Sequence, residues 1–195
     1  ITAIPNVFLG RVSPKGKLAK RDFSVDAPLF GRSQANQFTW KQVLDMFSCT
    51  ECGRCSSVCP AAATGKSLAP RQLLMNLRDH LYSNQSKLLA ANAETQFDSV
   101  VGEGKATVDD VIWSCVACRA CEEACPVNIE YVDKIIDIRQ HLVQEASRFP
   151  EELGRAFKGM ETQSNPWGIS SAERAGWAEG MDIPRVGPEQ KFEYL

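Results

Sequence analysis

The sequence of 195 residues has little of what marks several large classes of protein. It contains no run of 18 or more apolar residues, which a transmembrane helix would need. Its first residues also lack the basic and then apolar order of a secretory signal peptide. The formal net charge is only −2, which argues against a nucleic-acid-binding protein. We therefore expect this segment to bind no nucleic acid and to cross no membrane by itself.

Motifs for nucleotide binding and nucleophilic catalysis are missing as well. Residues 61–67 (AAATGKS) end like a phosphate-binding loop, but Pro60 stands where that motif requires its first glycine. The only two histidines, His80 and His141, are expected to be surface residues on the polar sides of helices. Without a nucleophile and base pair, the sequence indicates no site that converts a substrate.

Cysteine, by contrast, is abundant and regularly spaced. The eight cysteines form two groups of four, each with the spacing C-x2-C-x2-C-x3-C-P, and the second group follows the first by 66 residues. A serine and an aromatic residue precede the first cysteine of both groups. This correspondence indicates an internal duplication. The groups are Cys49, Cys52, Cys55 and Cys59, then Cys115, Cys118, Cys121 and Cys125.

This spacing suits iron and sulfide. Thiolates three residues apart on a tight loop can hold three corners of an iron–sulfur cube, whereas the fourth cysteine, followed by proline, points away from that loop. In two-cluster proteins with this pattern the fourth cysteine ligates the other cluster. We therefore expect two 4Fe-4S clusters. Cluster A is assigned to Cys49, Cys52, Cys55 and Cys125, and cluster B to Cys115, Cys118, Cys121 and Cys59.

Two other uses of the cysteines compete with iron and sulfur. Disulfides are disfavoured because cysteines three residues apart in one loop cannot all pair well and nothing marks a secreted chain. Two structural zinc sites would use all eight cysteines and make the chain a zinc-stabilised scaffold. Zinc ribbons, however, join two separated C-x2-C pairs instead of placing four cysteines within eleven residues.

Three residues between the cysteines are candidates for tuning the clusters. Gly53 is expected to let backbone N–H groups approach the sulfurs. Arg54 and Arg119 are each expected to place a positive charge beside a cluster, which would favour the reduced state and raise the reduction potential. The alternative for each arginine is a solvated side chain.

The periodicity of the apolar residues predicts an all-α fold. Residues 1–38, rich in Pro, Gly, Ser and Asn, are expected to form an extended arm. A helix capped by Thr39 begins a core domain over residues 39–148. Pro70 is expected to open a second helix with a leucine stripe, Thr107 to cap a third, and Val132 to begin a fourth that ends before residue 149. Residues 149–195 are expected to be a helical extension and tail, with helices over 151–163 and 170–180.

The sequence resembles the α-helical ferredoxins, which include the C-type iron–sulfur subunits of heterodisulfide reductases and the C-terminal half of succinate dehydrogenase iron–sulfur subunits. The resemblance covers about residues 39–148. It rests on both cysteine groups and on flanking residues such as Leu68, Pro70, Arg78, Ile129, Asp137 and Arg139.

The linker and residues 165–168 (NPWG) are most similar to membrane-bound iron–sulfur oxidoreductases that resemble electron-transfer-flavoprotein:quinone oxidoreductases. Those proteins carry an N-terminal haem-binding membrane domain and C-terminal CCG domains, neither of which is present in this segment. Both ends look cut, so we expect a piece of a longer polypeptide.

This resemblance implies electron relay by two 4Fe-4S clusters, from a flavoprotein towards quinone, on the cytoplasmic side of a membrane. The basic residues within positions 11–21 would then follow a last membrane helix, as the positive-inside rule predicts. The alternatives are a solvated linker for these residues and, for the chain, a soluble subunit that docks to a separate catalytic partner.

Overall fold

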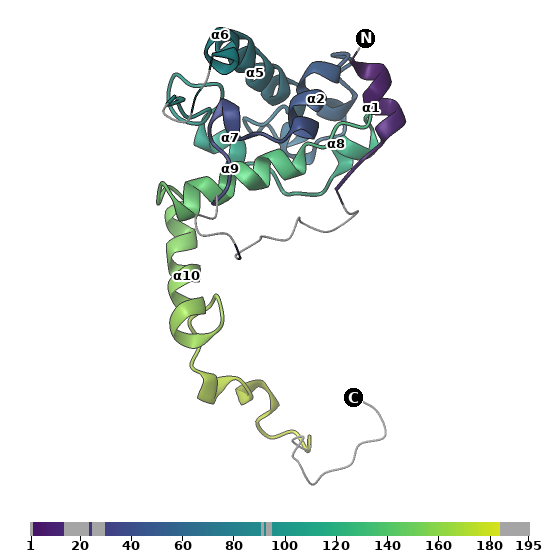
Figure 1. Ribbon diagram of the computed structural model, residues 1–195. Coiled ribbons are helices and arrows are strands. Elements are labelled where there is room, and N and C mark those ends of the chain that lie inside the picture. The colour runs from purple at the N-terminus through teal and green to yellow at the C-terminus, as the bar shows by residue number, and fades with distance from the viewer. Residues whose placement is uncertain (1, 14–23, 25–29, 91, 93–94, 184–195) are drawn as a thin grey trace. The chain divides into compact units, whose positions relative to one another are not determined.

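The computed structural model describes residues 2–13, 24, 30–90, 92 and 95–183, and it contains helices but no β strand within those residues. The basic residues after position 13 and the Pro-rich end lie outside the described residues. The chain divides into two units, residues 1–148 and 149–195 (Figure 1). An all-α fold is confirmed.

The first unit contains nine α helices and one 3-10 helix in its described part. Their bounds are α1 Ala3–Leu9, η1 Ala35–Gln37, α2 Trp40–Ser48, α3 Arg54–Ser57, α4 Pro60–Ala63, α5 Pro70–Ser83, α6 Gln85–Leu89, α7 Asp109–Trp113, α8 Ala120–Glu123 and α9 Val132–Gln144. None of the helices described in the chain is long and apolar enough to cross a membrane.

Two of the helices begin as their sequences predict. The Thr39 hydroxyl accepts a hydrogen bond from the Gln42 backbone, and the Gln42 side chain accepts one from the Thr39 backbone, so α2 has a complete capping box. Pro70 occupies the first position of α5, where its missing N–H is not needed. The leucine stripe of α5 is buried and forms the core together with α2, α7 and α9; it consists of Leu73, Leu74, Leu77 and Leu81.

One close approach joins the start of the core to α9. Gly31 has a φ of +81°, and a Cβ added to it would lie 2.2 Å from the backbone nitrogen of His141 and 2.3 Å from the carbonyl oxygen of Asp137. The next residue, Arg32, donates its backbone N–H to that same carbonyl at 2.9 Å. No other residue type fits at position 31 without moving α9.

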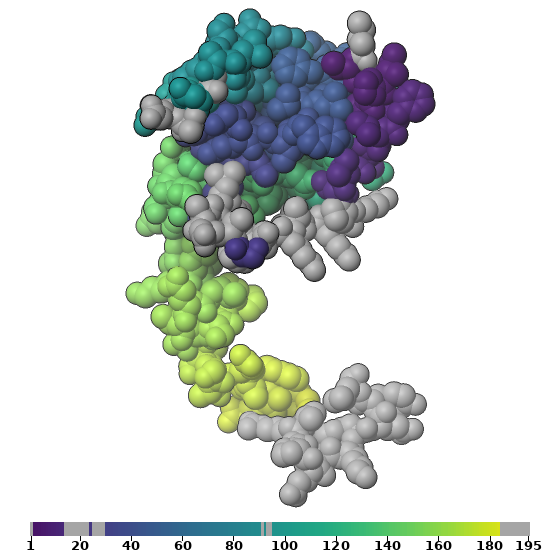
Figure 2. Space-filling model, in the orientation of Figure 1, coloured from purple at the N-terminus to yellow at the C-terminus, as the bar shows by residue number. Residues whose placement is uncertain are grey.

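The N-terminal arm differs from its prediction. Residues Ala3–Leu9 form a helix, α1, which packs beside α2 (Figures 1 and 2). Its polarity is inverted: Asn6 is fully buried, whereas Ile4 and Phe8 are exposed. The apolar periodicity of this segment therefore gives no sign of an inward-facing helix.

Two further elements differ from expectation. Thr107 does not cap a helix; α7 starts at Asp109, and Thr107 instead forms a bridge to Val101, donating its N–H to the carbonyl of Val100 at 3.0 Å. Residues 170–180 form two short 3-10 helices, η2 Ser171–Glu173 and η3 Gly176–Ala178, in place of one helix.

The second unit is built on α10, Glu151–Gln163, with the predicted bounds. The turn that follows folds back onto this helix: the Asn165 side chain exchanges hydrogen bonds with the backbone of Ile169 at 2.6 and 3.0 Å. A Cβ on Gly159 of α10 would lie 2.7 Å from the Asn165 carbonyl oxygen. Glycine at position 159 therefore allows the turn to lie against the helix.

Candidate iron–sulfur site

The two cysteine loops have the same backbone conformation. In each loop the residue two positions after the first cysteine has a left-handed φ, 56° at Glu51 and 54° at Ala117. This conformation turns the backbone N–H of Glu51 towards the Sγ of Cys49, and that of Ala117 towards the Sγ of Cys115, at 3.4 Å in both cases. The duplication seen in the sequence is therefore also a duplication of hydrogen bonds to sulfur.

A second left-handed residue precedes the short helix of each loop. Gly53 has a φ of 81° before α3, and Arg119 has a φ of 61° before α8. A Cβ added to Gly53 would meet nothing within 4 Å. Glycine allows the left-handed φ at this position, because the same backbone conformation costs a residue with a Cβ about 1 kcal/mol. The expected approach of N–H groups to the sulfurs at Gly53 remains a prediction.

Cysteines from both groups line one cavity in the first unit, which is partly open to solvent. The wall is otherwise mainly apolar and includes Leu68, Val132 and Ile135. The cavity therefore joins the fourth cysteine of the first group to the first three of the second. These cysteines are Cys59, Cys115, Cys118 and Cys121.

The remaining cysteines influence one another electrostatically. Burial raises the pKa of Cys49, and the neighbouring Cys55 and Cys125 raise it further, although the N–H of Glu51 lowers it. Burial also raises the pKa of Cys125, as do Cys55 and Cys52, against N–H groups that include that of Ile129 at 3.4 Å. Cys125 is thus a neighbour of the first group.

The two loops share the position of their most exposed cysteine. The middle cysteine of each triplet, Cys52 or Cys118, is exposed, whereas Cys55 and Cys59 are buried. Exposed Val116 lies beside Cys118 in the second loop. None of the eight cysteines, all of which lie within the described residues, forms a disulfide. Each loop therefore presents one cysteine at the surface.

The two predicted arginines have different environments. Arg54 is exposed, which agrees with the alternative of a solvated side chain. Arg119 lines the cavity, but its guanidinium is paired with the buried Glu122 at 2.8 Å and with Asp133 at 3.1 Å. Two carboxylates thus compensate its charge, so Arg119 does not add a net positive charge at the cavity.

The cation that acts on the second loop is Arg139 of α9. Its guanidinium donates to the carbonyl oxygens of Ile112 at 2.7 Å and Cys115 at 2.5 Å, and it lies 5.0 Å from the centroid of the Trp113 ring. Burial raises the pKa of Cys115, and the Arg139 charge lowers it. The spacing of the cysteines gives no sign of this contact, because Arg139 arrives from a helix 24 residues further along the chain.

Tyr131, immediately before α9, is a second residue that the sequence pattern does not reveal. It is buried, and its hydroxyl donates a hydrogen bond to the Sγ of Cys55 at 3.3 Å. Burial and the neighbouring Cys55 raise the pKa of Tyr131, so the hydroxyl keeps its proton. A buried tyrosine needs a partner for its O–H, but the sequence does not indicate which.

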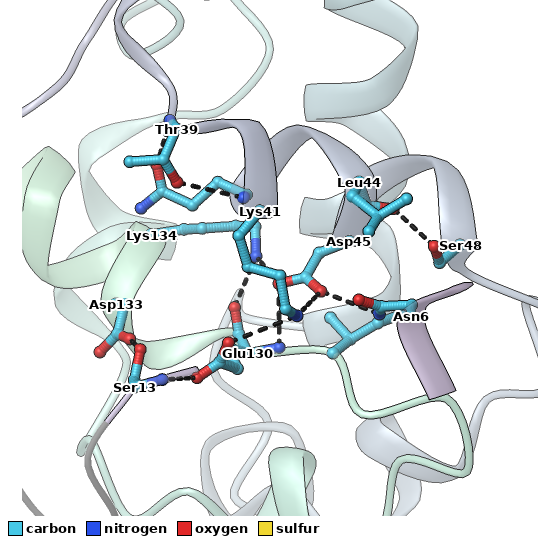
Figure 3. Close-up of polar contacts among 12 residues, drawn as sticks. Asn6, Ser13, Thr39, Lys41, Leu44, Asp45, Ser48, Glu130, Asp133 and Lys134 are labelled. Carbon is cyan, nitrogen blue, oxygen red and sulfur yellow. Dashed lines mark hydrogen bonds and ion pairs between the residues drawn. The ribbon is translucent and has the colours of Figure 1, made fainter. Parts of the chain in front are cut away.

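A buried charge network is centred on Asp45 (Figure 3). Asp45 of α2, fully buried, accepts hydrogen bonds from the ammonium groups of Lys41 at 2.5 Å and Lys134 at 2.7 Å. It also accepts from the Asn6 side chain at 3.0 Å and the Glu130 backbone at 3.2 Å. The four interactions connect α1, α2 and α9.

The histidines stand apart from the cysteines. His80 and His141 are half-buried, which is less exposed than predicted, and burial lowers the pKa of both. Neither lines the cavity that contains Cys59. They therefore contribute no ligand to it.

The comparisons with known proteins agree with the cysteine pattern. Residues 45–129 match the family described as "4Fe-4S dicluster domain". Over 97% of its length the chain is 35% identical to "Probable iron-sulfur-binding oxidoreductase FadF" of Bacillus subtilis (strain 168), of which it covers 32%. It is 37% identical, over 87% of its length, to "EtfAB:quinone oxidoreductase" of Syntrophomonas wolfei, of which it covers 27%.

A third relative is "Probable membrane-anchored ferredoxin" of Chromohalobacter salexigens, with 36% identity over 87% of the chain and 27% of the relative. The chain thus spans about a third or less of the length of these proteins. The resemblance seen in the sequence is confirmed, and the family match favours iron and sulfur over zinc and over disulfides.

Proposed function

We propose how the eight cysteines divide between the two 4Fe-4S clusters of this electron-transfer module, whose residues 45–129 match the 4Fe-4S dicluster domain. Cluster A is held by three cysteines of the first group and the fourth of the second. Cluster B is held by three of the second and the fourth of the first. The sets are Cys49, Cys52, Cys55 and Cys125 for A, and Cys115, Cys118, Cys121 and Cys59 for B.

The observation that carries this division is the shared cavity. Cys59 follows the first loop in sequence but lines the same cavity as Cys115, Cys118 and Cys121, while the pKa of Cys125 responds to the first group. The donor set fits the cofactor, since thiolates are the usual ligands of such clusters, N–H groups point at three of the sulfurs, and the walls are mainly apolar.

When bound, the clusters accept and release single electrons, and the protein's own groups set how readily they do so. N–H and O–H donors stabilise negative charge on the sulfurs, and apolar walls such as Leu68 limit water. The exposed Cys52 and Cys118 would hold a corner of each cluster near the surface, within reach of a partner that exchanges electrons.

Within a longer protein, we propose that this module relays electrons from a flavoprotein towards quinone, on the cytoplasmic side of a membrane. Three observations support this role: the relatives are three or more times longer, one is named for a quinone reaction and one for a membrane anchor. Arg11 pairs with Glu123 at 2.8 Å, but the other basic residues at positions 15–21 suit a membrane surface with anionic lipids. The full reading frame tests this role, since a soluble subunit would show no membrane spans.

The cluster content is tested on chain purified without oxygen. We expect about eight iron and eight sulfide per chain, as two 4Fe-4S clusters require. Two electron paramagnetic resonance signals should appear on reduction. A colourless chain with about two zinc ions would overturn the proposal.

The division of ligands is tested by replacing the fourth cysteine of one group at a time with serine. In Cys59→Ser the signal of the cluster bound by Cys115, Cys118 and Cys121 should change, while the other is retained. The matched variant, Cys125→Ser, should change the signal of the other cluster. If Cys59→Ser instead perturbed the cluster bound by its own loop, the division would be wrong.

A further inference from the structure

Tyr131 contacts both cysteine sites. Its side chain, 3% exposed, lines the cavity that contains Cys59 and the first three cysteines of the second group. From the same position its hydroxyl donates to the Sγ of Cys55, in the first group, at 3.3 Å. One side chain therefore lies against one cluster site and is hydrogen-bonded to a ligand of the other.

The backbone on both sides of Tyr131 is held by buried carboxylates. The preceding N–H, of Glu130, donates to Asp45 at 3.2 Å, and the following N–H, of Val132, donates to Glu122 at 2.8 Å. Asp45 is in turn fixed by Lys134 (Figure 3), and Glu122 is fixed by Arg119. A buried ion pair is weak support for stability, but here the two carboxylates fix the peptide groups that orient the tyrosine.

A hydroxyl that donates to a cluster thiolate acts differently on the two oxidation states. The reduced cluster carries one more negative charge, so a donor to its sulfur stabilises the reduced state more than the oxidised state. The phenol donates at neutral pH because its ordinary pKa is near 10. In the proposed division Cys55 belongs to cluster A, whereas Tyr131 meets cluster B through its buried ring.

We propose that the Tyr131 hydroxyl raises the reduction potential of cluster A relative to cluster B and so sets the driving force for electron transfer between them. This inference rests on the proposed division of the cysteines. One electron passes from one cluster to the other, and Tyr131 keeps its proton and is neither oxidised nor reduced. Asp45 and Glu122 are positioning residues, since they act through the backbone of Tyr131.

The test is a redox titration of Tyr131→Phe in the iron–sulfur-loaded chain, with both clusters followed by electron paramagnetic resonance. Loss of the hydrogen bond should lower the equilibrium constant for reduction of cluster A about threefold to tenfold. For a one-electron couple this is a decrease of about 28 to 59 mV in midpoint potential. The midpoint of cluster B should move by less than half as much.

Tyr82→Phe is the matched control. Tyr82 is 52% exposed, and its ring packs edge-on against Phe47 with the ring centroids 4.9 Å apart. Removing its hydroxyl should therefore change the midpoint potential of neither cluster. An unchanged midpoint of cluster A in Tyr131→Phe, or equal shifts of both clusters, would overturn the inference. The signals are assigned beforehand with Cys59→Ser and Cys125→Ser, so an error in the cysteine division is detected separately.

A second measurement covers the case in which Tyr131→Phe does not assemble its clusters. Meta-fluorotyrosine is a stronger hydrogen-bond donor than tyrosine, because its hydroxyl is more acidic. Incorporated into the double variant Tyr82→Phe/Tyr194→Phe, in which Tyr131 is the remaining tyrosine of the sequence, it should raise the midpoint of cluster A, a shift opposite in sign to that of Tyr131→Phe. A constant or lower midpoint would contradict the inference.

Discussion

Replacing Lys134 by methionine should destabilise the first unit strongly, although the two side chains are similar in size. The Lys134 side chain is 2% exposed, and its ammonium group contacts the fully buried Asp45 at 2.7 Å and the Glu130 carbonyl at 2.6 Å. Removing one partner of a buried ion pair costs about 3 to 5 kcal/mol. Because Lys41 still compensates Asp45 at 2.5 Å, we expect the lower limit, about 3 kcal/mol.

For a unit of this size, 1 kcal/mol corresponds to about 2 to 4 °C in Tm, so the Tm of Lys134→Met should fall by about 6 to 12 °C. The assay is anaerobic thermal denaturation followed by circular dichroism. Lys105→Met is the matched control, because the Lys105 ammonium pairs with Asp98 at 3.8 Å at the exposed surface. Exposed ion pairs contribute about 0 to 1 kcal/mol to the free energy of unfolding, so the Tm of Lys105→Met should change by less than about 4 °C.

A double variant tests the reasoning itself. In the wild-type chain Asp45→Leu leaves the buried Lys134 ammonium without its carboxylate. In Lys134→Met this ammonium is absent, so the free-energy cost of Asp45→Leu should be at least about 1 kcal/mol smaller than in the wild-type chain. Additive losses, or a Tm of Lys134→Met within about 2 °C of the wild type, would refute the coupling inferred from the distances.

Three other perturbations give separate checks. Gly31→Ala should cost about 3 kcal/mol or more because its Cβ would lie 2.2 Å from backbone, whereas Gly104→Ala, with φ +67° and nothing within 4 Å, should cost about 1 kcal/mol; equal losses in urea denaturation would contradict the close approach. Arg139→Gln should lower the midpoint potential of the cluster bound by Cys115, measured by redox titration, and an unchanged midpoint would exclude an effect of its charge. Burial raises the pKa of Asp45, but the charges of Lys134 and Lys41 outweigh it, so the pKa is lowered overall. The stabilisation by Asp45 is therefore present above its unfolded pKa of about 4 and is lost as the pH falls through the folded value. The Tm of the wild type should decrease more between pH 5 and pH 3 than that of Asp45→Asn, and parallel curves would contradict this sign.

The elements predicted correctly have local causes. The capping box at Thr39 and the proline that opens α5 act within one turn, so the sequence alone contains the information. The duplicated cysteine spacing predicts the loops for the same reason. The helix α1 escapes prediction because it buries Asn6 and exposes Ile4 and Phe8, which reverses the apolar pattern on which helix prediction depends.

The elements predicted wrongly or missed depend on contacts distant in sequence. Thr107 resembles a helix cap, but its backbone pairs with residues 100–102 instead. Tyr131 and Arg139 reach the cysteine loops from segments 76 and 24 residues away from their partners. Spacing within a motif contains no information about such partners, so the sequence predicts the candidate ligands but not the donors around them.

The cavity shared by the two cysteine groups also constrains the order of events during synthesis. Cys59 leaves the ribosome 62 residues before Cys121, and at about 5 to 20 residues per second this interval is about 3 to 12 seconds. The cavity needs both residues, so it does not exist during that interval. In the proposed division the four ligands of this cavity are complete only after both cysteine groups have been translated, so delivery of iron and sulfide to it follows that step.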